Sequence, residues 1–224
     1  MIKNISNLGD AALYCDFGDE VSKEINSTVI RYFKNLKEKD IPGIINLTPS
    51  YNKLIVSFDL REVSFIKVKK IVENLDISEF PSEISKKIEI PVCCNDLFSL
   101  DIKRLEEKLS LNREKVYENF FGKEFFCYMT GFIAGMPFLG DLDKSMRANR
   151  LETPRVKVPK GSVGLTEQFT NIYTFESPGG WNIIGNTPLE IFDSSKIDDP
   201  NLISPGDIVI FKQISLEDHK NYNE

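Results

Sequence analysis

The sequence predicts an α+β protein with two domains, and three observations support this prediction. Residues 11–92 combine two amphipathic helical patterns with four short apolar runs. Residues 124–213 instead carry many short apolar runs separated by Gly and Pro, with little helical periodicity. Between the two patterns lies a polar, proline-interrupted segment, FPSEISKK at residues 80–87. We therefore expect one domain at residues 1–84 and a second at residues 85–224.

The N-terminal half has the pattern of a helix-covered antiparallel sheet. The expected strands are residues 11–17, 44–48, 54–58 and 88–92, and the expected helices are residues 19–39, capped by Asp19, and 65–75. The order strand, helix, strand, strand, helix, strand is typical of a ferredoxin-like split βαβ domain, with both helices on one sheet face. Its residues form no obvious active site, so we interpret this half as a scaffold or docking module.

The C-terminal half predicts a closed or nearly closed β-barrel. Short helices are expected at residues 100–109 and 112–121, followed by strands at 124–130 and 207–213. The turn-rich stretch 153–192 between them predicts a series of short strands joined by tight turns around a concave surface. Residues 131–140, GFIAGMPFLG, are too hydrophobic for an ordinary solvent loop. This segment either crosses the core or lines a groove, and the sequence leaves both alternatives open.

The turn-rich stretch also contains the residues that first indicate a binding surface. Gly179 and Gly180 precede Trp181, the only Trp of the chain, so backbone can approach a ligand closely beside an aromatic wall. Arg155 stands in a stiff Thr-Pro-Arg frame, with Lys157 and Lys160 nearby, which suits either an anion site or a solvated positive edge. The glycines lack the spacing of a nucleotide-binding loop.

Composition excludes several classes of function. The net charge of -6 argues against a nucleic-acid partner, and the absence of a long apolar run or a signal-peptide pattern predicts a cytoplasmic protein without a membrane segment. Four cysteines without CxxC spacing indicate buried, reduced thiols rather than a metal site. The lone His219 lies in a polar tail, which excludes Ser-His or Cys-His catalysis. No metal or bound organic cofactor is expected.

Several long blocks resemble one protein family. They are GFIAGMPFLGDLD (131–143), TPRVKVPKGSVGL (153–165), NIYTFESPGGWNIIGNTPLEIF (171–192) and SPGDIVIFKQI (204–214). Together with the opening IKNISNLGDAALYCDFGDE, they are similar to the family of allophanate hydrolase subunit 1, KipI and the 5-oxoprolinase B subunit, the carboxyltransferase subdomain C and D family. The resemblance implies a ferredoxin-like domain followed by a cyclophilin-like β-barrel.

The resemblance also implies a function. The favoured one is the B subunit of an ATP-dependent 5-oxoprolinase-type hydrolase, which converts 5-oxoproline, ATP and water to glutamate. It would act with a second cyclophilin-like subunit of the C type and a lactam-utilisation-type subunit, with ATP used by the complex and no activity alone. The alternatives are a KipI-like inhibitor that binds a sporulation sensor histidine kinase, and a carboxyltransferase subunit of the allophanate hydrolase or urea carboxylase type.

Each hypothesis assigns its own residues. In the hydrolase, Arg155 is the catalytic candidate that holds developing negative charge with backbone N–H groups of the glycine-rich turns. The substrate-binding candidates are Lys157, Gly161, Ser162, Gly164, Thr170, Tyr173, Ser177, Gly179, Gly180 and Trp181. In the binding protein, a groove grips a partner segment, and its expected lining is Phe132, Met136, Phe138, Phe169 and Trp181.

Three positions depart from the family pattern. Phe120 stands where the family usually has His, Phe169 where it often has Gln, and Asn186 where it has the Arg of GRTP. We expect these three side chains to face the barrel cleft, where the replacements would remove polar groups from the site.

Overall fold

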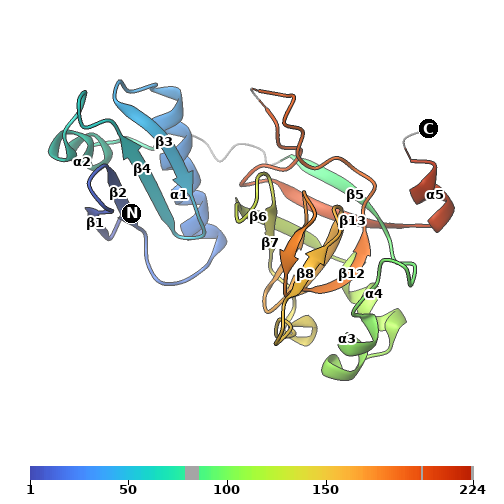
Figure 1. The fold of residues 1–224 in the computed structure, drawn as a ribbon. Helices are drawn as coiled ribbons and strands as arrows, with labels where there is room; N and C mark the ends of the chain where they lie inside the picture. Colours follow the sequence, from blue (N-terminus) through green and yellow to red (C-terminus); the bar gives the residue numbers. More distant parts are fainter. Residues whose placement is uncertain (79–85, 198, 223–224) are drawn as a thin grey trace. The chain divides into compact units, whose positions relative to one another are not determined.

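The computed structural model describes residues 1–78, 86–197 and 199–222. Most of the segment expected to link the domains, residues 80–87, lies outside the described residues. The chain divides into two compact units, residues 1–85 and 86–224 (Figure 1).

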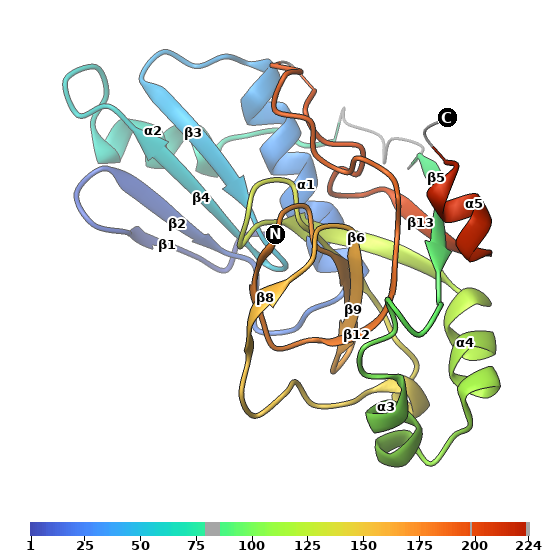
Figure 2. The ribbon, with the colours of Figure 1, turned by 45° about the vertical axis from the view of Figure 1, so that its right-hand side comes forward.

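The first unit is a four-stranded antiparallel sheet with two helices. Its strands, β1 (Asn4–Asn7), β2 (Ala12–Asp16), β3 (Ile44–Pro49) and β4 (Lys53–Phe58), lie in the order β1-β2-β4-β3. Its helices are α1 (Lys23–Glu38) and α2 (Phe65–Glu73), and both lie on one face of the sheet (Figure 2). Side chains of both helices and of that sheet face form a single buried cluster, as the alternating pattern of the strands predicts.

Helix α1 begins later than the sequence predicted. Its N-cap is Ser22, whose hydroxyl accepts a hydrogen bond from the Ile25 N–H at 3.3 Å, so the prediction of Asp19 as the cap is wrong. The preceding segment is instead held by the β3–β4 turn, because the Asn52 side chain donates to the Glu20 carbonyl at 3.1 Å. The apolar stripe of the helix is as predicted, with Val29, Tyr32 and Leu36 buried.

The expected fourth strand of this unit is also wrong. Residues 88–92 lie within β5 (Lys87–Cys93), which belongs to the second unit and pairs in parallel with β13 (Ile208–Ile214). The fourth strand of the first unit is β1, a short and mostly exposed run, Asn-Ile-Ser-Asn, without an apolar signal. The ferredoxin-like order, which needs a last strand after α2, therefore does not describe the first unit.

The second unit is a closed seven-stranded barrel, as the turn-rich sequence predicted. Its remaining strands are β6 (Glu124–Thr130), β7 (Pro137–Gly140), β9 (Ser162–Thr166), β10 (Phe169–Ile172) and β12 (Asn182–Asn186). The order around the barrel is β10-β7-β6-β13-β5-β12-β9, and β10 closes it by pairing with β9. The last four residues of the hydrophobic segment 131–140 are thus a barrel strand, which explains why Leu139 is apolar and buried.

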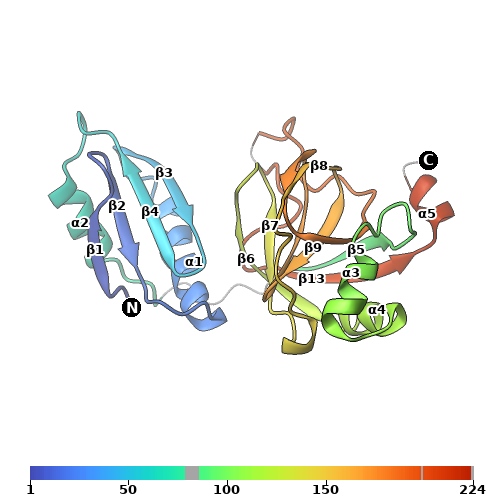
Figure 3. The same ribbon diagram turned by 60° about the horizontal axis from the view of Figure 1, so that its bottom comes forward.

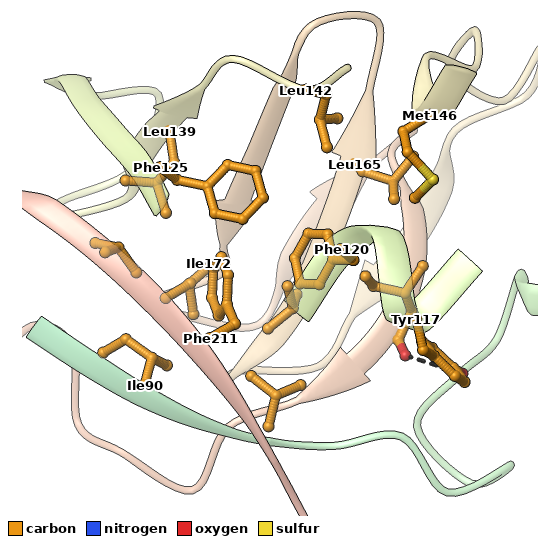
Figure 4. Packing of buried hydrophobic residues seen from close by; sticks show 14 of the residues in the cluster. Ile90, Tyr117, Phe120, Phe125, Leu139, Leu142, Met146, Leu165, Ile172 and Phe211 are labelled. Carbon is orange, nitrogen blue, oxygen red and sulfur yellow. Dashed lines mark hydrogen bonds between the residues drawn. The ribbon is translucent and has the colours of Figure 1, made fainter. Parts of the chain in front are cut away.

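The barrel interior is a packed apolar core. Alternate residues point inward, among them Leu139, Leu165 and Ile172, and all three are fully buried. Phe120, from helix α4 (Arg113–Phe121), stacks on Phe211 inside this core with ring centroids 4.9 Å apart (Figure 4). The interior is therefore filled by side chains and is not a ligand cavity.

Shorter elements surround the barrel. Helix α3 (Ile102–Leu109) lies beside α4 at one end, and β5 runs alongside β13 (Figure 3). A separate two-stranded sheet consists of β8 (Arg155–Val158) and β11 (Ser177–Gly179). A 3-10 turn, η1 (Lys144–Met146), and a short final helix, α5 (Leu216–Lys220), complete the unit. The sheet β8–β11 carries several of the predicted site residues.

Candidate functional site

The outer face of the barrel differs from its interior. On β7, β10 and β9, the residues between the inward-facing ones are Phe138, Asn171 and Gly164, which therefore point outward. Trp181, directly before β12, contacts Phe138 edge-on with ring centroids 5.6 Å apart. A small apolar cluster of Met136, Val158, Tyr173 and Ile183 lies on this face, with Phe138 packed against it. Aromatic and polar groups thus meet outside the barrel core.

Tyr173 is the centre of this outer face. Its side chain is 1% exposed, and its phenol oxygen lies so close to Gly179 that a methyl group at Gly179 would overlap it. Burial raises the pKa of the Tyr173 phenol, while the Asn171 side chain, the Trp181 backbone N–H and the charges of Arg150 and Arg155 partly offset that rise. Gly179, the first of the two glycines noted in the sequence, is therefore needed for close contact with Tyr173.

A buried ion pair joins two distant parts of the chain beside Tyr173. The Arg155 Nη2 atom lies 2.6 Å from Asp101 Oδ1, and the Asp101 side chain is only 6% exposed. The other carboxylate oxygen of Asp101 accepts a hydrogen bond from the Ile183 N–H at 2.7 Å. Asp101 thus ties β8 to β12, and the charge of the predicted catalytic residue Arg155 is balanced by a neighbour.

Two further arginines lie near this ion pair. Arg104, on α3, donates hydrogen bonds to the Asn182 side chain and to the Asn149 carbonyl. The exposed Arg150 lies next to Gly180, since a methyl group there would come within 3.3 Å of its Nε atom. We call Arg104, Arg150 and Arg155, together with Asp101, the arginine cluster. Within it, three positive charges face one negative charge.

Several buried polar atoms near the arginine cluster have no hydrogen-bond partner among the described residues. They are Arg155 Nη1, Asn171 Oδ1 and Ser177 Oγ. Asn171 is fully buried, and its unpartnered oxygen faces the space left by the missing side chain of Gly164. A buried donor or acceptor without a partner costs about 1–3 kcal/mol, so such atoms usually have a function or a missing partner. This combination makes the outer face the candidate functional site.

Some predicted substrate-binding residues have other roles in the structure. The N–H groups of Gly161 and Ser162 already donate to Tyr173 and Pro159, at 2.7 and 3.2 Å, so they are not free to hold an anion. The Thr170 hydroxyl donates to the Gly164 carbonyl at 2.8 Å. Gly164 itself lies in β9 between two partner strands.

Lys157 also differs from its expected role. Its side chain is 74% exposed, and its ammonium group lies 2.8 Å from the carboxylate of Glu176, which directly precedes β11. This pairing raises the pKa of Lys157. An anion that binds Lys157 would first have to displace the Glu176 carboxylate. Lys157 is therefore a weaker anion ligand than the exposed Arg150, for which the described residues show no ion pair.

The predicted groove residues share one surface only in part. Met136, Phe138 and Trp181 lie together on the outer face, and Phe169 lies on the same face of β10, edge-on to Tyr128 at 5.9 Å. Phe132 does not join them, because it is 72% exposed in the turn between β6 and β7 with φ of 69°. The structure therefore does not bring Phe132 together with the other predicted groove residues, and its part in a groove stays a prediction.

The three departures from the family pattern do not line one cleft, contrary to expectation. Phe120 is fully buried in the barrel core. Phe169 packs on Tyr128, and the Asn186 side chain lies 2.9 Å from His219 Nε2 and donates to the Lys160 carbonyl. Because these side chains serve three separate packing roles, they do not remove a common set of polar groups from the outer face.

A surface depression of about 510 Å³ lies elsewhere, between α4 and the ends of β5 and β13. It is lined by Cys94, Arg113, Tyr117 and Phe121 among others. Arg113 is already paired with Asp96 at 2.7 Å, and the Tyr117 hydroxyl lies 2.9 Å from Ser99 Oγ. Because its arginine and its tyrosine hydroxyl already have partners, this depression is a weaker candidate than the outer face despite its volume.

The described residues contain no group of His, Cys, Asp and Glu that could hold a metal ion. The four cysteines are buried and unpaired, and burial raises the pKa of Cys94 to about 12, which keeps the thiol neutral. Among the helices in the described part of the chain, none has the length and apolarity needed to cross a membrane.

Sequence reasoning missed four residues of this site, and Arg104 on α3 is one of them. Asp101 stands directly before α3, where an acidic residue usually caps the helix, but its side chain makes no cap bond and turns to Arg155 instead. Arg150 and Asn171 carry no distinctive spacing. The barrel topology brings them together, and no local pattern could have found them.

The fold and this outer face define a class of protein. Residues 3–203 match the family model of the carboxyltransferase domain, subdomain C and D, and the chain belongs to that family. The resemblance seen in the sequence is thus confirmed. A curated relative from Bacillus subtilis (strain 168), named as the B subunit of 5-oxoprolinase, is 36% identical over 98% of this chain and 96% of its own length.

Solved structures share the fold. The sequence of TTHA0988, whose crystal structure is known, is 29% identical to this chain, and the two structures superpose over 91% of this chain with a TM-score of 0.82. This chain spans only 40% of TTHA0988. The Kluyveromyces lactis urea carboxylase is 19% identical with a TM-score of 0.77, over 97% of this chain and 22% of that one. At that identity the likeness concerns the fold alone.

Proposed function

We propose that this chain is the B subunit of a cytoplasmic, ATP-dependent 5-oxoprolinase, a complex that opens 5-oxoproline to glutamate. Its partners in this proposal are a second cyclophilin-like subunit of the C type and a lactam-utilisation-type subunit. The observation that carries the proposal is the match to the 5-oxoprolinase B subunit of Bacillus subtilis, because it extends over both units at 36% identity.

The chemistry of the outer face supports this function. A five-membered lactam is a poor electrophile, and phosphorylation of its amide oxygen by ATP makes the carbonyl carbon open to attack by water. The substrate and the product both carry carboxylates, so a subunit of this complex needs cationic groups at its surface. The arginine cluster provides them, whereas the barrel interior is fully packed with apolar side chains.

The proposal is tested by reconstitution. The chain is expressed with its two companion subunits, and glutamate and ADP are measured after addition of 5-oxoproline and ATP. We expect glutamate and ADP to form in equal amounts only when this chain is present. A stable complex of all three subunits without turnover, or equal turnover when this chain is omitted, would contradict the proposal.

A second candidate function is partner binding of the KipI type, and one observation favours it. Phe132 is 72% exposed and adopts a positive φ of 69°, a conformation that is strained for an aromatic residue. An aromatic side chain that stays exposed in such a turn is available as an anchor for a partner protein. Autophosphorylation of sporulation sensor histidine kinases, measured with saturating wild-type or Phe132→Ala protein, tests this alternative, and unchanged kinase activity excludes it.

A further inference from the structure

The arginine cluster offers one guanidinium that the rest of the site does not use. Arg155 is bound by Asp101, and Arg104 by the Asn182 side chain and the Asn149 carbonyl. Arg150 is exposed, and among the described residues no ion pair or hydrogen bond is found for its guanidinium. It is therefore the group of the cluster that is free to bind a ligand.

The position of Arg150 is defined by small residues around it. Its Nε and Nη2 atoms lie 3.3 and 3.4 Å from the point that a methyl group on Gly180 would occupy. The ring of Pro154 borders the same point at 3.5 Å. Any side chain at residue 180 would press against the guanidinium, so the glycine keeps the space in front of Arg150 open.

The surroundings of Arg150 favour an anion. Arg150 and Arg155 both lie near enough to Tyr173 to lower the pKa of its phenol, and Asp101 supplies the only negative charge of the arginine cluster. The buried Nη1 atom of Arg155 and the buried Oδ1 atom of Asn171 have no hydrogen-bond partner in the part of the chain that the structure describes. A planar carboxylate fits the fork of a guanidinium by two parallel hydrogen bonds.

We propose that Arg150 binds the carboxylate of the substrate, while Asp101-bound Arg155 supports it from behind without making the main contact. This inference rests on the proposed function, because it takes 5-oxoproline as the ligand. Arg150 is then a specificity-determining residue, since it separates 5-oxoproline from lactams that lack a carboxylate. The reaction steps themselves do not involve it.

Steady-state kinetics of the complete three-subunit complex test this role. Arg150→Gln removes the charge and the fork, and we expect the KM for 5-oxoproline to rise about tenfold or more, with little change in kcat. Arg150→Lys keeps the positive charge but loses the two parallel N–H donors, so its KM for 5-oxoproline should lie between those of the wild-type and Arg150→Gln complexes. The KM for ATP and the inhibition constant of 2-pyrrolidinone, a lactam without a carboxylate, should not change.

The matched control is Lys144→Gln, which removes one exposed positive charge from the same segment of the chain and should leave every constant unchanged. Two results would overturn the inference: an unchanged KM for 5-oxoproline in the Arg150→Gln complex, or a rise in the KM for ATP instead. If the wild-type complex shows no turnover, the proposed function fails first. Calorimetry then measures binding of 5-oxoproline to the wild-type and Arg150→Gln complexes. Binding that is lost in the variant supports the carboxylate site, and equal binding to both complexes, or binding to neither, overturns it.

Discussion

The inner and outer faces of the barrel wall differ in the kind of side chain they carry. Inside, Leu139, Leu165 and Ile172 are fully buried among apolar neighbours. Outside, the same strands present Phe138, Gly164 and Asn171 toward a region with arginines, a buried carboxylate and polar atoms without partners. Because the side-chain period of a strand is two, one sequence can serve stability and binding at once.

The contrast explains why substitutions at two kinds of position have different meanings. A change inside the barrel alters packing and is expected to lower stability whatever the function is. A change on the outer face can leave stability intact and alter ligand binding. The family departures Phe120 and Phe169 therefore concern packing first.

The largest effect is expected inside the barrel, for Phe120→Ala. The substitution removes the ring that stacks on Phe211 at 4.9 Å and leaves a cavity, so we expect a loss of about 3–5 kcal/mol in the free energy of unfolding. Urea denaturation measures it. Phe132→Ala, at the exposed turn, is the control and should stay within about 0.5 kcal/mol. Equal losses of unfolding free energy in Phe120→Ala and Phe132→Ala would contradict the difference between the barrel core and the surface.

The next effect concerns the buried ion pair. Asp101→Asn leaves the Arg155 charge without its partner, and we expect a loss of about 2–3 kcal/mol, below the usual range because Arg155 is 28% exposed. The double variant Asp101→Asn with Arg155→Met should recover part of this loss, since it removes the unpaired charge as well. Additive losses in a double-mutant cycle would show that the two side chains are not coupled.

A smaller effect is expected at the glycine beside Tyr173. Gly179→Ala places a methyl group over the phenol oxygen, and we expect a loss of about 1–3 kcal/mol in the free energy of unfolding. Adding Tyr173→Phe removes the oxygen that overlaps most, but the ring carbons at 2.8 and 2.9 Å remain, so it should restore only part of the lost stability. Thermal unfolding of the single and double variants measures both. Failure of the second substitution to restore stability would show that the overlap with Tyr173 is not the cause.

The smallest effect is a pH dependence at the edge of the barrel. Burial lowers the pKa of His219 below 6.5, so the unfolded chain takes up this proton at a higher pH than the folded chain. The stability from neutral His219 is complete above pH 6.5 and falls as the pH drops toward its folded pKa. Urea midpoints between pH 7.5 and 5 should fall less in His219→Gln, and identical slopes would refute this.

The sequence predicted the parts of the fold that follow from local periodicity. The strand at 124–130, the helix from Asn112 to Gly122 and the strands within 153–192 follow from apolar spacing and turn residues, and the structure has them. It failed where pairing is non-local. Strand β1 has too few apolar residues to be recognised, and β5 pairs in parallel with a strand near the other end of the chain.

The candidate site shows the same division. Arg155, Tyr173, Gly179 and Trp181 were predicted from a stiff turn, an aromatic residue and a glycine pair, and the structure brings them together. The ion-pair partner of Arg155 was not predicted, because Asp101 lies 54 residues away in the chain. The charge balance that distinguishes Arg155 from Arg150 depends on that contact, so no sequence pattern could rank the two.

Chemical labelling of arginine tests the role of the outer face most directly. The chain, in its complex, is treated with phenylglyoxal with and without 5-oxoproline, and the modified residues are identified by mass spectrometry. We expect Arg150 to be labelled in the free complex and protected by 5-oxoproline. Arg61, an exposed arginine of the first unit, should be labelled equally in both samples. Equal labelling of Arg150 with and without 5-oxoproline would contradict the assignment of this surface as the carboxylate site.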